Sequence, residues 1–194
     1  MVRIAGYFYL GMALLALVLN LARGAPPVPF ALGPRLVPAL GWAIVGAAVT
    51  VALSRSFERR FAWARELSEW FRSKLGPLEP REVHALALAS GIAEELLFRG
   101  ALQPAFGSLL GSPLAGWAVA TLAFGLLHFA GPERWPWTVF ALVLGGYLGA
   151  LQLYADNVLA PIVLHVVVND INLRRIARPA PFLGKTERGR RPPS

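Results

Sequence analysis

Six blocks of apolar sequence constrain this chain of 194 residues more than any other feature. Five of the blocks are 18–21 residues long and one has 16 residues, close to the length of about 20 residues that an α-helix needs to cross a hydrocarbon core about 30 Å thick. Hydrophobic residues make up 56% of the chain and charged residues 15%, whereas soluble domains carry about 25% charged residues. The blocks span residues 4–21, 36–53, 83–103, 114–129, 137–154 and 159–176. The pattern predicts an all-α, polytopic membrane helix bundle of about six transmembrane helices.

The segment between the second and third blocks has a different character. Residues 54–81 carry seven Arg or Lys and four Glu, interleaved with aromatic side chains. Several apolar residues of this segment fall close to one helical face: Phe57, Phe61, Leu67, Trp70 and Phe71. Such a distribution predicts an amphipathic helix at the membrane interface, with its arginines toward lipid headgroups. A loop is expected after the third block, where Pro104 and Pro113 flank two glycines.

The formal charge of +8 has a topological interpretation. The basic residues lie mainly between and after the apolar blocks, which favours cytoplasmic loops over nucleic-acid binding. Residues 54–81 and the C-terminal tail are the most basic regions, and four predicted crossings separate them. We therefore predict that both termini are cytoplasmic, in the inner membrane of a bacterium. Residues 1–178 are expected to form a single membrane domain, and residues 179–194 a disordered, basic, proline-rich tail.

Ionisable residues inside the blocks are the strongest functional signal. A charge at the centre of a membrane helix costs about 2.5–3.5 kcal/mol, so such residues normally face the bundle interior and each other. Glu95 and Arg99 are four residues apart and can pair on one helical face. Glu94 points about 100° away, on the face of Gly91, whose missing side chain is expected to leave room beside it. One carboxylate is thus neutralised locally and the other is free, although a structural ion pair with a spare Glu remains the alternative.

Two later blocks carry histidines. Phe124 and His128 are four residues apart in the fourth block, and His165, Asn169 and Asn172 make one face of the sixth block polar. Each pattern taken alone is compatible with a structural histidine or with hydrogen bonds between helices.

A carboxylate and two imidazoles on three helices of one small bundle can converge. Peptide hydrolysis needs a base that activates water, an acid for the leaving amine and a stabiliser of the oxyanion. Glu94 is the candidate base, and His128 would orient the water or act as the acid. His165 and Asn169 would donate to the oxyanion. A serine or aspartyl protease fits poorly, because the chain has no Gly-x-Ser-x-Gly block and no pair of membrane-embedded Asp residues. The absence of cysteine excludes thiolate catalysis and cysteine-ligated metals.

Three short motifs stand in a fixed order on separate predicted helices: Glu-Glu-x-x-x-Arg at Glu94, Glu95 and Arg99, Phe-x-x-x-His at Phe124 and His128, and His-x-x-x-Asn at His165 and Asn169. Over residues 82–176 this set resembles the CPBP family, which includes CAAX prenyl endopeptidases and bacterial proteins once grouped as abortive-infection or bacteriocin-immunity proteins. The resemblance implies a glutamic intramembrane endopeptidase that cleaves a membrane-anchored protein or peptide near its C-terminus. It implies catalytic roles for Glu94, His128, His165 and Asn169, and supporting roles for Glu95, Arg99 and Phe124.

Several alternatives stay open at this point. Two His and one or two Glu could bind zinc, whose catalytic sites often use three protein ligands, but metal-free chemistry is favoured because Glu95 is committed to Arg99 and no His-Glu-x-x-His block occurs. A non-enzymatic membrane scaffold or immunity protein is a second possibility, and a small transporter a third. Some family members are thought to process C-terminal anchors in the manner of a sortase, which is one candidate activity here.

Overall fold

The structure is a computed structural model that describes residues 2–30 and 32–177. All the regular secondary structure in these ranges is helical. The elements in chain order are α1 (Val2–Ala22), α2 (Leu36–Arg60), α3 (Ala62–Leu75), α4 (Pro80–Glu95), the π-helix η1 (Leu96–Leu102), α5 (Gln103–Leu109), α6 (Pro113–Leu127), the 3-10 helix η2 (Pro132–Arg134), α7 (Trp135–Ala155) and α8 (Leu159–Ala177). The predicted all-α helix bundle is confirmed. The predicted tail at residues 179–194 lies outside the described residues.

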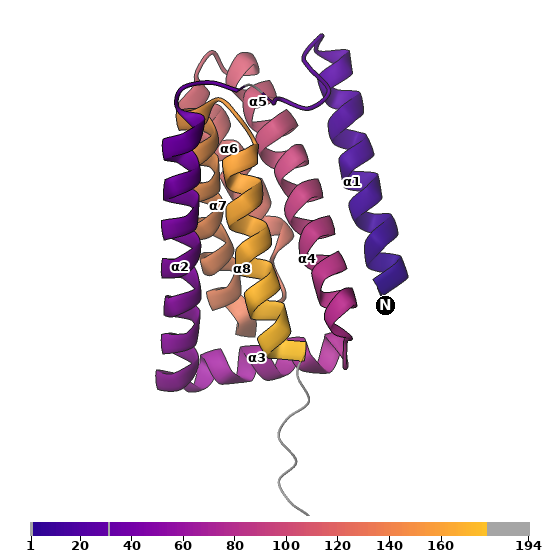
Figure 1. Cartoon of the computed structure of the whole chain (residues 1–194), viewed down its shortest axis with the longest axis vertical. Helices are drawn as coiled ribbons and strands as arrows, with labels where there is room; N and C mark the ends of the chain where they lie inside the picture. The colour runs from indigo at the N-terminus through magenta and orange to yellow at the C-terminus, as the bar shows by residue number, and fades with distance from the viewer. Residues whose placement is uncertain (1, 31, 178–194) are drawn as a thin grey trace, which may run out of the picture.

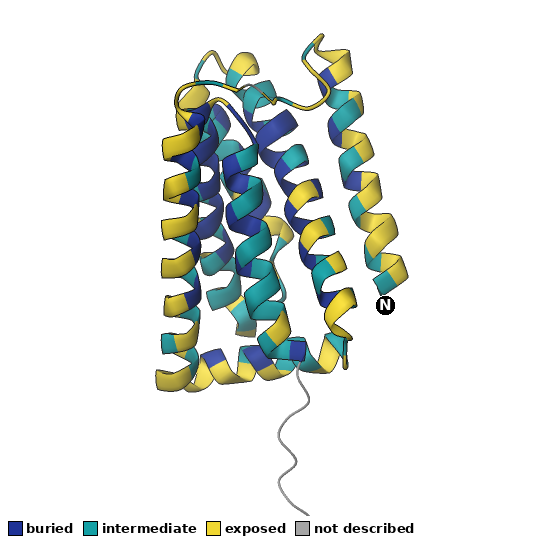
Figure 2. Ribbon diagram, in the orientation of Figure 1, coloured by how far each residue is buried: buried dark blue, intermediate teal, exposed yellow. Residues whose placement is uncertain are grey.

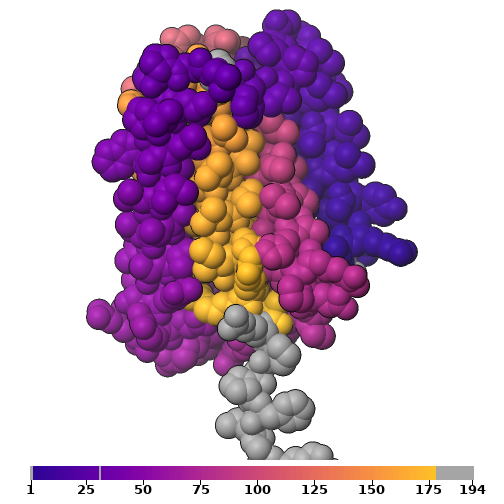
Figure 3. All heavy atoms as spheres, viewed as in Figure 1, coloured from indigo at the N-terminus to yellow at the C-terminus, as the bar shows by residue number. Residues whose placement is uncertain are grey.

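α8 lies in the middle of the front layer of the bundle (Figure 1). α8 packs between α2 and α4, with α6 and α7 behind this layer and α1 on the outer side of α4. α3 runs across one end of the bundle, roughly perpendicular to the other helices, and the N-terminal end of α1 and the described end of α8 lie toward this same end. Figure 3 shows α8 as a continuous strip of surface between α2 and α4.

By length and composition, three of the described helices are able to cross a membrane: Val2–Ala22, Leu36–Arg60 and Pro132–Ala155. α6 is apolar but only 15 residues long. α4 and α8 carry the ionisable residues of the predicted third and sixth spans. The bundle is that of a helical membrane protein, and the number of six crossings stays a prediction.

Burial follows the pattern expected for a bundle in lipid (Figure 2). α1 and α2 present large apolar side chains outward, including Tyr7, Val18, Val37 and Trp42. A soluble monomer rarely exposes an apolar surface of this extent. Inward, α2 presents a row of alanines to α7 and α8: Ala39, Ala43 and Ala47. Small residues at this spacing allow helix backbones to approach closely, which is typical of membrane helix packing.

The predicted amphipathic helix within residues 54–81 ends as expected at Gly76, but its expected continuity from residue 54 is wrong. The backbone leaves the helical region at Phe61, where φ is −121° and ψ is 134°, so α2 ends there and α3 begins. Phe57, Phe61 and Trp63 make mutual aromatic contacts with ring centroids 5.7–6.1 Å apart. The corner between the two helices is therefore packed, and α3 alone is the helix that lies across the end of the bundle.

The predicted loop at residues 104–113 is also mostly wrong. The helix that contains Glu94 continues through η1 into α5 and ends only at Leu109. Pro104 occupies the first turn of α5, a position where proline is well tolerated. The connection to α6 is correspondingly short.

Candidate active site

The helix that carries the two glutamates changes its winding directly after them. α4 ends at Glu95 and the π-helix η1 begins at Leu96. π-helical turns inside longer helices are rare and frequently occur at functional sites. Here the π-helix carries Arg99 back toward the bundle interior, and the side chains of Glu94, Glu95 and Arg99 are all buried.

Glu95 is the centre of a buried ion-pair cluster. Its Oε1 accepts from Arg99 Nη1 at 3.0 Å and from His165 Nδ1 at 2.7 Å. The predicted pairing of Glu95 with Arg99 is confirmed. Arg99 Nη2 also donates to the carbonyl oxygen of Gly145 on α7, at 2.9 Å. The guanidinium carbon lies 4.3 Å from the centroid of the Phe124 ring on α6. Glu95 and Arg99 thereby tie α4, α6, α7 and α8 together.

Glu94 faces two imidazoles from two other helices. Its Oε2 lies 3.8 Å from His128 Nε2 and 3.9 Å from His165 Nε2. The structure therefore brings the three candidate residues together. Within the described residues, Glu94 Oε2 accepts no hydrogen bond, although it is fully buried. Separations of this size exceed direct hydrogen-bond lengths and are of the kind that a water molecule can bridge.

His128 reaches the site because α6 is short. His128 is the C-cap of α6 and lies in the middle of the bundle, at the end of a helix about 22 Å long. Its Nδ1–H donates to the carbonyl oxygen of Phe124 at 2.8 Å, which turns Nε2 toward Glu94. Phe124 and Trp137 pack against the His128 ring, with centroids 4.4 and 5.6 Å away. The His128 side chain is 19% exposed, against 8% for Glu94, so the accessible side of the site is at His128.

Asn169 lies one turn along α8 from His165 and binds a different partner. Its Nδ2 donates to Ser90 Oγ at 2.9 Å, and Ser90 Oγ donates to the carbonyl oxygen of Ala87 at 3.3 Å. His165 and Asn169 thus contact α4 at two separate levels, His165 through Glu95 and Asn169 through Ser90.

The expected space beside Gly91 is filled. A Cβ atom on Gly91 would lie 2.6 Å from Cγ2 of Val166 and 3.0 Å from the Val166 backbone nitrogen. Gly91 therefore serves the close approach of α4 and α8, and Val166 fills the space that its missing side chain leaves. This close contact brings His165 within reach of both glutamates.

Three polar residues around the site were not singled out by the sequence. Gln103 continues the spacing of Glu95 and Arg99, and its Nε2 donates to Gln152 Oε1 at 2.7 Å and to the Gly149 carbonyl at 3.1 Å. That four-residue spacing was visible in the sequence. Ser90 lies four residues before Glu94, a spacing that was likewise visible in the sequence. Tyr9 of α1, which lies next to Ser90, carries no comparable signal.

The described residues do not offer a metal-binding cluster. No three His, Cys, Asp or Glu side chains among them are placed to hold a metal ion. His165 Nδ1 and Glu95 Oε1 already bind each other. The donor set does not fit the three protein ligands that a catalytic zinc site normally uses.

Comparison with known proteins gives one match. Residues 80–171 match the family model described as "Type II CAAX prenyl endopeptidase Rce1-like". This range overlaps the core of residues 82–176 that the sequence motifs indicate, and it contains all the residues of the Glu94 and Glu95 clusters. No curated protein and no solved structure matches the chain significantly.

Proposed function

We propose that the chain, whose residues 80–171 match the Rce1-like family model, is a glutamic intramembrane endopeptidase in which Glu94 activates the attacking water. This match supports a membrane peptidase that acts on a membrane-associated protein or peptide. The observation that carries the glutamic mechanism is the position of Glu94 Oε2, between His128 Nε2 at 3.8 Å and His165 Nε2 at 3.9 Å.

In the proposed reaction, Glu94 and His128 hold a water molecule between them. Glu94 takes a proton from this water as its oxygen attacks the carbonyl carbon of the scissile peptide. The His128 ring is fixed for this task, because its Nδ1–H is held by the Phe124 carbonyl and only Nε2 faces Glu94. When the C–N bond breaks, the same proton passes to the leaving amine. The products are then a carboxylic acid and a free amine. A positioned acid–base group of this kind contributes about 10²–10⁴-fold to a rate.

His165 and Asn169 are the proposed stabilisers of the oxyanion. With a second proton on its ring, His165 can donate from Nε2 while Nδ1–H stays on Glu95. Asn169 has two amide hydrogens, and only one of them is used by Ser90. Glu95 acts through His165 and Arg99, and is a positioning residue rather than a catalytic one. Phe124 supports the site through the faces it offers to Arg99 and His128.

We propose that this chemistry needs no metal ion. Of the candidate zinc ligands, Glu95 is already paired with Arg99 and with His165 Nδ1. The proposed route uses only a carboxylate and two imidazoles, and no step in it requires a Lewis acid.

The proposed substrate is a membrane-anchored protein that is cut near its C-terminus. A bacterial cell that lacks prenylated CAAX proteins would use such an enzyme on other anchors, for example to process C-terminal membrane tails in the manner of a sortase. We further propose that the protein lies in the bacterial inner membrane with both termini cytoplasmic. This orientation is supported by the location of both described ends of the chain near the basic helix α3.

The test is a cleavage assay with the full chain in liposomes. A panel of membrane-tethered C-terminal segments from the same cell is added, and mass spectrometry detects the products. Glu94→Gln and His128→Gln should each lower cleavage about 10²-fold or more, whereas the matched Glu69→Gln on the exposed surface of α3 should cleave as the parent does. Equal cleavage by all four proteins would show that another group does the chemistry. Intact substrates in every case, with an unchanged phenotype for Glu94→Gln in the cell, would favour the scaffold or immunity alternative.

A further inference from the structure

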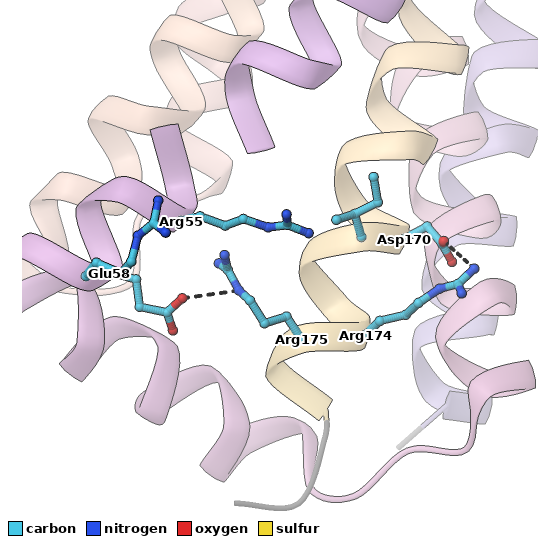
Figure 4. Close-up of a pocket in the computed structure, with 7 residues that line it drawn as sticks. Arg55, Glu58, Asp170, Arg174 and Arg175 are labelled. Atoms are coloured by element: carbon cyan, nitrogen blue, oxygen red, sulfur yellow. Dashed lines mark ion pairs between the residues drawn. The ribbon is translucent and has the colours of Figure 1, made fainter. Parts of the chain in front are cut away.

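A second concentration of charge lies at the α3 end of the bundle, between α2 and α8. A pocket of about 560 Å³ opens there. Figure 4 shows the side chains of Arg55 and Arg175 reaching from α2 and α8 into the space between the two helices. The pocket is lined by Arg55, Glu58, Arg59, Asp170, Ile171, Arg174 and Arg175. Nothing in the proposed proteolytic mechanism uses these residues.

The positive charges in this pocket outnumber the negative ones. Four arginines face two carboxylates. Arg174 is paired with Asp170 at 2.7 Å, and Arg175 with Glu58 at 3.2 Å. Among the described residues, Arg55 and Arg59 have no ion-pair partner. The pocket therefore carries two uncompensated positive charges and attracts an anion.

Arg175 also has unsatisfied hydrogen-bonding capacity. Its Nη1 atom is buried and has no hydrogen-bond acceptor among the described residues. Buried N–H groups in folded proteins are nearly always hydrogen bonded. An acceptor oxygen placed between Arg175 and Arg55 would satisfy this group, and the oxygens of a phosphate suit the forked geometry of guanidinium groups.

The pocket lies at the level where a bilayer changes from hydrocarbon to headgroups. On α2, the exposed residues directly before it are apolar, among them Val49 and Leu53. The helix then becomes basic at Arg55 and turns at Phe61 into α3, which runs across the end of the bundle. Basic pockets between membrane helices at this level bind anionic headgroups.

The pocket is separate from the candidate active site. It faces α2, whereas His165 faces the glutamates of α4. An apolar cluster that includes Val51, Leu164 and Val168 fills the interior between α2 and α8. His165 and Arg175 are ten residues apart on α8, or about 15 Å along its axis. This arrangement favours a lipid over the terminus of a peptide that is bound for cleavage.

We propose that the pocket between α2 and α8 binds the phosphate of an anionic phospholipid headgroup, held by Arg55, Arg59 and Arg175. The lipid would sit against the outward apolar face of α2 with its headgroup in the pocket. Arg174 and Asp170, which neutralise each other, form the wall toward α4. This inference stands on the pocket alone and holds whether or not the chain is a protease.

The test titrates short-chain phosphatidylglycerol into the full chain in neutral detergent and follows the thermal midpoint of unfolding. The apparent affinity of the parent protein is compared with that of Arg55→Gln/Arg59→Gln, in which the Glu58–Arg175 pair is kept. The double variant should bind about 25-fold more weakly, at about fivefold for each arginine. The matched control is Arg3→Gln/Arg81→Gln, which removes the same charge from exposed positions on α1 and α4 and should bind as the parent does. Without lipid, the parent and the pocket variant should unfold at the same temperature, because neither changed pocket residue has an ion-pair partner. The control variant is compared with its own lipid-free midpoint, because Arg81 is paired with Glu79 at 2.9 Å.

Three further arms decide the source of the anion. Phosphatidylcholine should raise the midpoint much less than phosphatidylglycerol. If inorganic phosphate at the same concentration raises the midpoint equally, the site takes a soluble anion and the lipid proposal is overturned. The proposal is also overturned if the pocket variant binds phosphatidylglycerol as tightly as the parent does, or if the control variant loses as much affinity as the pocket variant. If the pocket variant instead binds lipid normally but loses preference for peptides with a free C-terminal carboxylate, the pocket belongs to substrate recognition and the proposal is wrong.

Discussion

Two carboxylates in this chain each contact one histidine and the arginine four residues further on, yet they lie in opposite environments. The first is Glu95, with His165 at 2.7 Å and Arg99 at 3.0 Å. The side chains of Glu95, His165 and Arg99 are at most 4% exposed. Four helices meet around them, and the second nitrogen of His165 faces Glu94.

The second carboxylate is Asp170 on α8. His84 Nδ1 lies 2.6 Å from its Oδ1, and Arg174 Nη2 lies 2.7 Å from its Oδ2. The exposed fractions of these side chains run from 18% to 48%. The residue spacing and the distances are close to those of the Glu95 cluster, although His84 and Arg174 contact different oxygens of Asp170 and their counterparts share one oxygen of Glu95.

The difference teaches that burial, rather than the pairing pattern, gives a charged cluster its consequences. An ion pair that is exposed to solvent contributes about 0–1 kcal/mol to the free energy of unfolding. In a buried cluster the attraction is stronger, and the loss of one partner leaves an uncompensated charge that costs about 3–5 kcal/mol. The Glu95 cluster can therefore fix the orientation of His165, whereas the Asp170 cluster adds little to stability.

The largest effect is expected for Glu95→Gln. This change leaves Arg99 buried without a counter-charge, so the free energy of unfolding should fall by about 3–5 kcal/mol. The matched Asp170→Asn should lower it by about 1 kcal/mol or less. Both values can be measured by denaturant unfolding in the same detergent. Equal losses for the two variants would contradict the argument from burial.

A somewhat smaller effect is expected for the histidines, measured as activity. His165→Gln should lower cleavage by about 10²–10³-fold, the usual result of removing one oxyanion-stabilising donor. His84→Gln should change cleavage less than about twofold, because His84 contacts only the exposed cluster. This prediction rests on the proposed proteolytic activity and uses the assay described for Glu94. A loss in His84→Gln comparable to that in His165→Gln would mean that the exposed cluster takes part in catalysis.

Neighbouring glycines on α7 test how tightly the buried cluster is enclosed. A Cβ atom on Gly145 would lie 2.9 Å from Cδ1 of Phe124 and 3.1 Å from Nη2 of Arg99. Gly145→Ala should therefore lower the free energy of unfolding by about 1–3 kcal/mol through overpacking. At Gly146 the nearest atom, on Trp117, would be 3.5 Å away, an ordinary contact. Gly146→Ala should be neutral or up to about 1 kcal/mol more stable, because alanine favours the helix. A stabilised Gly145→Ala would show that the enclosure of Arg99 is loose.

The sequence predicted the helices better than the junctions between them. Block length follows from the thickness of a bilayer, so the apolar segments were visible without tertiary information. The break at Phe61 depends on an aromatic corner that α2 and α3 build together. The continuation through Pro104 depends on the π-helix before it. Neither feature has a local sequence signal strong enough to predict it.

Within the site, contacts along one helix were predictable and contacts between helices were not. The four-residue spacing of Glu95 and Arg99 specified their pair. The contact of His165 with Glu95 spans 70 positions in the chain and depends on the rotation of α8 about its own axis. That rotation is set by the close packing of Val166 on Gly91. From their spacing on one helix, His165 and Asn169 are expected to act as one unit. In the structure, His165 contacts Glu95 and Asn169 contacts Ser90.

The smallest effect is expected from removing metal ions, and it bears on both clusters. In each cluster the carboxylate and the histidine already contact each other, so neither offers three free ligands of the kind that a catalytic zinc site uses. Incubation with a strong chelator should therefore change cleavage less than about twofold, and metal analysis of the active protein should find well under one zinc per chain. Activity that chelation abolishes and zinc restores would mean that Glu94 Oε2 and the facing Nε2 atoms of His128 and His165 hold an ion. The His84→Gln variant is the control for zinc that binds at the exposed cluster. If zinc binds only there, this variant should lose the zinc and keep its activity. Such a result would replace the glutamic mechanism by a metal-dependent one while leaving the importance of burial intact.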